Sequence, residues 1–259
     1  MSAPQTPAPP TTVAHVTTRP PVLASLRALT WLLLRNQATR GRLFALAALG
    51  VVGVLVGAVV TDNSSLDATV AGTRFVNLYG LSLLTPVVAL VFGAGALGDL
   101  VDDRSLVYLW LPPVPRWVIA LAAWIATLVV CIPFTLGASV VMSAATGGGA
   151  DLVIGTLWAS LLGLIAYSGL FTALGLRFRR ALVWGFAYLL IWENFVAQAG
   201  DGAARLSILS YLRSLLSAYT GAGLELADRS LTASFIVPVV VGLLGFAYTV
   251  RRLHTTDVD

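Results

Sequence analysis

The sequence contains no lysine: all 16 of its basic residues are arginine. A P-loop ATPase uses a lysine to reach the β- and γ-phosphates, and a Schiff-base enzyme uses one as its nucleophile, so both classes are excluded. Charge is scarce as well, since charged residues make up 11% of the chain against about one quarter in soluble domains. The chain is therefore neither a standard P-loop ATPase nor a typical soluble domain.

Cysteine and histidine are nearly absent too. Cys131 stands alone, so no disulfide can form within the chain, and the two histidines, His15 and His254, lie outside every long apolar run. No HExxH motif, cysteine pair or histidine-aspartate cluster has the spacing of a metal site, and no Ser-His dyad can form inside a membrane. We expect a non-catalytic chain that binds no cofactor itself.

Long apolar runs dominate what the sequence does contain. Hydrophobic residues make up 58% of the chain, and about 20 helical residues cross the ~30 Å hydrocarbon core of a bilayer. The runs are continuous rather than alternating, which disfavours a β-barrel. We predict an all-α polytopic membrane protein with six transmembrane helices, at Leu43–Val60, Phe75–Leu97, Trp117–Met142, Leu152–Leu174, Ala181–Val196 and Leu231–Val250.

The arginines beside these runs predict the orientation of the chain. Few of them fall on the side away from the termini, namely Arg74, Arg205, Arg213 and Arg229. By the positive-inside rule both termini are then cytoplasmic, as in a bacterial cytoplasmic membrane or another plasma membrane. Arginines beside spans, rather than along one exposed face, do not indicate a nucleic-acid partner.

Residues 1–21, rich in Pro, Thr and Ala, predict a disordered cytoplasmic tail.

Two further segments are neither spans nor plain loops. Residues 22–42 carry leucines at helical spacing with arginines between them, which predicts a helix on the cytoplasmic membrane surface, or alternatively a helix buried against the bundle. Residues 200–230 face outward and contain RLSILSYLRSLLSAY, which is too polar to span the membrane and too apolar for a loop. It predicts a short helix, either re-entrant in the outer leaflet or lying on the surface. Residues 22–259 form one transmembrane domain.

Two polar residues fall inside predicted spans and are candidates for a pathway or gate. Glu193, at the end of the fifth span, is the only acid within a span, and a buried acid in a membrane is a functional candidate because it is costly there. The alternative is that Glu193 caps helix packing near the outer interface or pairs with an arginine of the next loop. Asn77, near the start of the second span, is expected to make an interhelical hydrogen bond, with a ligand role as the alternative.

Residues 98–116, GDLVDDRSLVYLWLPPVPR, interrupt the apolar pattern between the second and third spans. The aspartates suit the start of a short helix, the prolines stop that helix, and Arg116 marks the return to the membrane. A charged turn that only fixed the topology would not need the apolar residues that follow Arg104. We therefore interpret the segment as a cytoplasmic docking element.

The stretch DLVDDRSLVYLWLPPVPRW resembles the coupling region of ABC-2 type transporter permeases. In that region an acidic residue, a spacer and leucines precede a Pro-Val-Ser/Pro-Arg motif at the start of the third span. The surface helix, the six spans and the outward helical segment are similar as well. Two departures stand out: Arg104-Ser105 replaces the usual glycine-threonine pair, and the lysine often found after the arginine is missing.

The resemblance implies a permease subunit of an ATP-driven transporter, more often an exporter than an importer. ATP and Mg would be bound by a partner P-loop ATPase subunit, and a second permease copy or paralogue would complete the pathway. The residues implied to couple this chain to the ATPase are Asp99, Asp102, Asp103, Arg104, Leu106, Leu109, Pro115 and Arg116.

Two other functions stay open at the level of the sequence. A secondary transporter or channel would carry several intramembrane ionisable groups, and here Glu193 stands alone. A membrane scaffold that docks a cytoplasmic protein without transporting anything is the other alternative.

Overall fold

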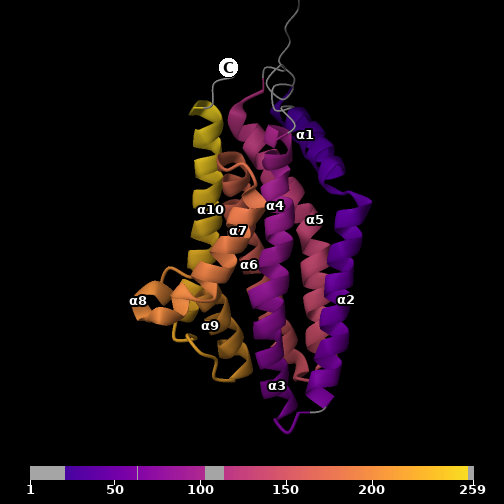
Figure 1. Ribbon diagram of the computed structural model, residues 1–259, viewed down its shortest axis with the longest axis vertical. Coiled ribbons are helices and arrows are strands. Elements are labelled where there is room, and N and C mark those ends of the chain that lie inside the picture. Colours follow the sequence, from indigo (N-terminus) through magenta and orange to yellow (C-terminus); the bar gives the residue numbers. More distant parts are fainter. Residues whose placement is uncertain (1–20, 63, 103–113, 256–259) are drawn as a thin grey trace, which may run out of the picture.

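The computed structural model describes residues 21–62, 64–102 and 114–255, and within these ranges it contains helices and no strand (Figure 1). Five helical stretches are long and apolar enough to cross a membrane. They are α2 (Arg40–Asp62), the continuous run of α3 (Ala68–Phe75), π-helical η1 (Val76–Leu84) and α4 (Thr85–Asp102), then α5 (Arg116–Ala145), α6 (Gly149–Arg177) and α10 (Leu231–Thr255). The chain is thus an all-α protein with the helices of an integral membrane protein.

Shorter helices complete the described part of the chain. They are α1 (Val22–Gln37), α7 (Ala181–Ala187), π-helical η3 (Tyr188–Glu193), 3₁₀-helical η4 (Val196–Ala199), α8 (Asp201–Ala204) and α9 (Ile208–Thr220). In Figure 1, α1 and the C-terminal end of α10 lie at the upper end, whereas α3 and α9 lie at the lower end. We call these the α1 end and the α9 end of the bundle.

The fifth predicted span, Ala181–Val196, is not a membrane-length helix. Seven residues of α7 and six of η3 form one apolar helix, Ala181–Glu193, which reaches roughly 20 Å of the ~30 Å core. Where the helix ends, the Asn194 side-chain amide donates a hydrogen bond of 2.8 Å back to the Leu189 carbonyl, and the chain then turns into η4. Five of the six predicted spans are therefore long apolar helices, and the predicted length of the fifth span was wrong.

The predicted amphipathic helix at residues 22–42 is shorter than expected and packs on the bundle along one face. It ends at Gln37, because Ala38 leaves the helical conformation and α2 begins at Arg40. Leu33 is buried in a cluster with residues of α4 and α5, whereas Leu23 is 79% exposed. One face of the helix therefore packs against the bundle and the other faces away from it, and its place at the membrane surface stays a prediction.

Glycines allow the central helix α6 to approach its neighbours closely. A Cβ atom on Gly169 would lie 2.4 Å from the Gly242 carbonyl oxygen of α10, and one on Gly175 would lie 2.3 Å from the Ala94 carbonyl oxygen of α4. Only residues without a side chain fit such contacts, which are typical of helices packed in membranes. The small residues at these positions of α4 and α10 therefore make contacts within this chain.

Candidate functional site

The predicted coupling segment, residues 98–116, is described only at its two ends. Asp103, Arg104, Leu106 and Leu109 lie outside the described residues, and Asp102 is the last residue of α4, with a side chain that is also outside them. Asp99, Pro115 and Arg116 are described. The segment therefore starts directly from α4 and returns directly into α5, at the α1 end of the bundle (Figure 1).

Asp99 holds the start of this segment against α2. Its carboxylate forms a salt bridge with Arg42, with 2.7 Å between Oδ2 and Nη1, and the two side chains are about one third exposed, at 35% and 31%. The guanidinium passes close to Gly95, where a Cβ atom would come within 3.0 Å of Arg42 Nη1. A partly exposed pair of this kind contributes about 0–1 kcal/mol to stability, so it links the end of α4 to α2 without adding much to the stability of the fold.

Arg116 holds the other end of the segment against α10. Pro115 is the residue before α5 and is extended, and its carbonyl accepts a hydrogen bond of 2.9 Å from the Val118 amide. The Arg116 guanidinium donates through Nη1 to the Leu253 carbonyl near the end of α10. A cation beside the last carbonyls of a helix is favourable because the helix dipole leaves negative charge there. The two ends of the segment are thus fixed to two different helices, α2 and α10.

Glu193 lies at the N-terminus of α9 and is almost completely buried, with 2% of its surface exposed. Its Oε1 accepts hydrogen bonds from the Tyr188 hydroxyl (2.8 Å) and the Ile208 amide (3.1 Å), and its Oε2 accepts from the Ser207 hydroxyl (2.5 Å) and the Leu209 amide (3.2 Å). These bonds satisfy amides that have no partner within the helix, and the carboxylate sits at the positive end of the helix dipole. The geometry is that of a cap, the alternative role named for Glu193 above.

Asn77 also contacts α9, the helix that Glu193 caps. Its Oδ1 accepts a hydrogen bond of 3.0 Å from Nε of Arg213 in α9, although the two residues are 136 positions apart. This is the interhelical hydrogen bond expected for Asn77. Both polar residues that fall inside predicted spans therefore converge on α9.

Asn77 and Glu193 also share an unusual backbone. Asn77 lies in η1 and Glu193 ends η3, and these are the π-helical elements among the described residues. In η1, the Ser82 hydroxyl donates to the Asn77 carbonyl (2.9 Å) and the Thr85 hydroxyl to the Gly80 carbonyl (2.8 Å). π-Helical segments occur mostly as short insertions and often at functional sites, because the wider turn redirects side chains.

Arg213 is the residue at this site that sequence reasoning missed. It was counted only as a loop arginine for orientation, yet it is 8% exposed and lies among buried residues of α9. A signal was available, because Arg213 follows Leu209 by four residues and precedes Leu216 by three, on the apolar face of a helix.

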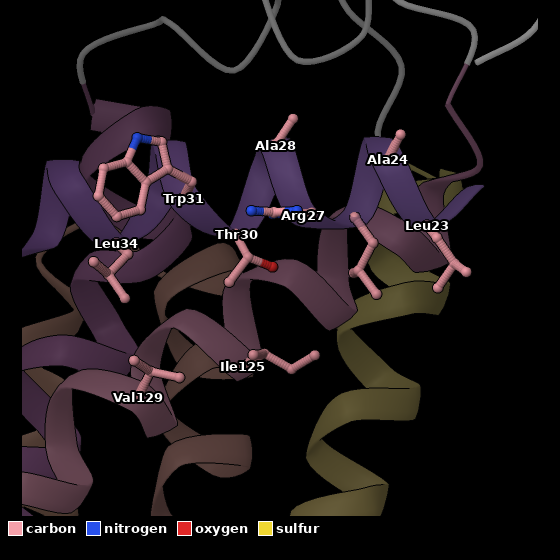
Figure 2. Close-up of a pocket in the computed structure, with 10 residues that line it drawn as sticks. Leu23, Ala24, Arg27, Ala28, Thr30, Trp31, Leu34, Ile125 and Val129 are labelled. Carbon is pink, nitrogen blue, oxygen red and sulfur yellow. The ribbon is translucent and has the colours of Figure 1, made fainter. Parts of the chain in front are cut away.

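A groove of about 1110 Å³ between α1 and α5 is different in character. Figure 2 shows Leu23 and Leu34 of α1 on one side of it and Ile125 and Val129 of α5 on the other. Apart from Arg27 and Thr30, its lining residues are apolar. The groove offers no nucleophile, acid or base, and the described residues contain no cluster of three His, Cys, Asp or Glu that could hold a metal ion.

Comparison with known proteins adds nothing to this geometry: the chain matches no protein-family model, no curated protein and no solved structure.

Proposed function

We propose that this chain is the permease subunit of an ATP-driven transporter of the ABC-2 type, and that it acts as an exporter. A separate P-loop ATPase subunit would supply the energy, since this chain has no lysine. A second permease, identical or related, would complete the pathway between the two subunits.

The observation that carries the proposal is the continuity of the helices on either side of residues 98–116. Ala68–Val101 is a run of 34 residues and Arg116–Ala145 a run of 30, and both extend from the segment at the α1 end toward the opposite end of the bundle (Figure 1). Neither run is interrupted by a loop, so a displacement applied at Asp99 or at Arg116 would be carried along a continuous helix. A docking element joined to two rigid helices suits the transmission of a displacement.

The salt bridge and hydrogen bond at the ends of the segment extend this mechanical link. Asp99 joins α4 to α2, and Arg116 joins α5 to α10. When ATP closes the partner's nucleotide-binding domains, the segment would move with them, and its displacement would reach four helices rather than two. In this proposal Asp102, Asp103, Arg104, Leu106 and Leu109 contact the ATPase.

The short helix Ala181–Glu193 serves as the sixth crossing in this proposal. The start of α2 and the end of α10 both lie at the α1 end, as Arg42–Asp99 and Arg116–Leu253 indicate, so an even number of crossings is needed. Because that helix covers only part of the hydrocarbon core, α9 would fill the remaining depth as a re-entrant helix. The burial of α9 and its contacts with α6, α10 and η1 support this arrangement.

The test is reconstitution in liposomes with the P-loop ATPase encoded by the adjacent reading frame. We expect the two proteins to co-purify and ATP hydrolysis to rise above the rate of the ATPase alone. Reversing two charges, Asp103→Arg with Arg104→Asp, should return hydrolysis to that basal rate while the permease still inserts and folds. Arg205→Asp, an exposed charge at the opposite end, is the matched control and should leave the coupled rate unchanged.

Other outcomes would reject the proposal. Co-purification without stimulated hydrolysis in any lipid mixture would indicate a scaffold. Substrate flux that follows an ion gradient and needs no ATPase would indicate a secondary transporter. Unchanged hydrolysis in the charge-reversed variant would remove residues 98–116 from the coupling role.

A further inference from the structure

A polar cavity of about 400 Å³ lies at the α9 end, beside the Asn77–Arg213 hydrogen bond. Its lining residues come from three parts of the chain: the junction of α3 and η1, the middle of α9, and the segment between α9 and α10. They are Arg74, Asn77, Arg213, Gly223, Leu224 and Glu225. Unlike the apolar groove beside α1, this cavity is lined mostly by charged and polar groups.

Arg213 brings a nearly buried positive charge to the cavity. Its Nε is engaged by Asn77, and no carboxylate of the described residues lies within 4.0 Å of its guanidinium. A guanidinium keeps its charge in proteins and presents five N–H donors, of which Asn77 takes one. The remaining donors of Arg213 make no hydrogen bond within the described part of the chain, and the carboxylates of Glu193 and Glu225 lie farther than 4.0 Å away, so these donors are available to a ligand.

Arg74 supplies a second cation on the open side of the same cavity. It lies in the last turn of α3, is exposed, and makes no hydrogen bond or ion pair within the described part of the chain. Arg74 and Asn77 are three residues apart on one continuous helix and so share a face. Two guanidinium groups and an amide that converge on one cavity are suited to bind an oxyanion, because planar guanidinium groups pair with phosphate through two parallel hydrogen bonds.

Glu225 is the one negatively charged residue that lines the cavity. It is exposed and forms no ion pair with either arginine, so its charge is available to a ligand. A ligand made only of negative charge would be repelled on that side. A phosphate with an amine close to it would satisfy both the arginines and Glu225.

We propose that this cavity binds a zwitterionic phosphate group of the phosphoethanolamine kind, with its phosphate on Arg74 and Arg213 and its amine on Glu225. Such a group can come from an outer-leaflet phospholipid or from a soluble phosphate ester, and both sources present the same chemistry. Binding at this cavity does not depend on coupling to an ATPase. If the cavity does not bind phosphoethanolamine, the proposed transport function is unaffected, and if the transport function is rejected, the binding proposal is unaffected.

The test measures binding to the purified full chain in detergent, without ATP or an ATPase. Soluble phosphoethanolamine and inorganic phosphate are titrated by calorimetry, and we expect phosphoethanolamine to bind at least tenfold more tightly. Arg74→Gln should weaken phosphoethanolamine binding about tenfold. Arg205→Gln removes an exposed arginine at the same end and outside the cavity, and it should have no effect.

Glu225→Gln should change the affinities for the two probes in opposite directions, which a general loss of folding would not do. This variant should weaken binding of phosphoethanolamine and strengthen binding of inorganic phosphate, because the repulsive carboxylate is gone. Nanodiscs identify the source: if phosphatidylethanolamine in the disc blocks the soluble probe, whereas phosphatidylglycerol does not, the site takes a lipid headgroup; if neither blocks it, the site takes a soluble ester.

Three results would overturn the proposal. The first is that the wild-type protein binds neither soluble probe. The second is that Arg74→Gln binds phosphoethanolamine as tightly as wild type does. The third is that Glu225→Gln changes the affinity for both probes in the same direction.

Discussion

The Ser207 hydroxyl donates a 2.5 Å hydrogen bond to Glu193 Oε2, so the end of one apolar helix is joined to the residue that caps another. Ser207 in turn accepts a hydrogen bond of 3.3 Å from the Ser210 amide. The α9 helix therefore begins with two nested caps, one from its own N-cap residue and one from a carboxylate 14 positions earlier. Its orientation depends on Glu193 as much as on its own sequence.

Replacing Glu193 should destabilise the protein, because α9 would lose its buried cap. We expect Glu193→Ala to lower the free energy of unfolding by at least about 2 kcal/mol, since each buried polar group left without a partner costs about 1–3 kcal/mol. Glu193→Gln should cost less, because its carbonyl can still accept two of the hydrogen bonds. The measurement is unfolding in detergent, with Asp228→Asn, an exposed acid at the same end, as the control. An alanine variant as stable as that control would mean that α9 does not need the cap.

The Asn77–Arg213 hydrogen bond should show direct energetic coupling. Its donor is charged and nearly buried, and hydrogen bonds to charged groups contribute about 1.5–3 kcal/mol. A double-mutant cycle with Asn77→Ala and Arg213→Gln should therefore give a coupling energy of about 1–2 kcal/mol. If the two single effects add within about 0.5 kcal/mol, the contact does not hold η1 to α9.

The Arg42–Asp99 salt bridge should matter for coupling more than for stability. Each side chain is about one third exposed, so Asp99→Asn should change the unfolding free energy by less than about 1 kcal/mol. If the chain is the permease proposed above, Arg42→Asp and Asp99→Arg should each reduce ATPase stimulation, and the exchanged pair together should restore part of it. A double variant as inactive as the worse single variant would show that the pair itself is not required.

Gly169 should tolerate no side chain, because its Cα faces the backbone of α10. A Cβ atom there would lie 2.4 Å from the Gly242 carbonyl oxygen, so Gly169→Ala should destabilise the protein by about 1–3 kcal/mol through overpacking. Gly137→Ala is the matched control: it is also a helical glycine, but a Cβ atom there meets nothing within 4 Å. Thermal unfolding of the two variants side by side measures the difference. Equal midpoints would show that α6 and α10 can separate at no cost.

The long helices were predictable because each contains enough apolar residues in sequence to identify it without a partner. Arg40–Asp62, Arg116–Ala145 and Gly149–Arg177 each include the whole predicted span and extend beyond it, since helices that leave the hydrocarbon core can continue with polar residues. Glu193 and Asn77 could also be recognised from the sequence, because polar side chains are rare in these apolar runs.

The partners of these polar residues were not predictable from local pattern. Nothing in the sequence near Asn77 indicates that its partner is 136 positions away, and Arg213 resembled one more charge in an outward loop. The fifth span was too long in the prediction because hydropathy counts the residues after Glu193 as apolar, whereas the chain turns there to deliver that carboxylate to α9.

Composition and hydropathy act locally along the chain, so the order of the amino acids was enough to predict a helical membrane protein and the places of its long helices, and it shows directly that no P-loop lysine is present. The packing of the helices was needed to show that Glu193 caps α9, that Asn77 holds Arg213, and that Arg74, Arg213 and Glu225 line one cavity. The reason is physical: a buried charge is stable only with partners, and the partners are chosen by how helices pack rather than by their order in the sequence.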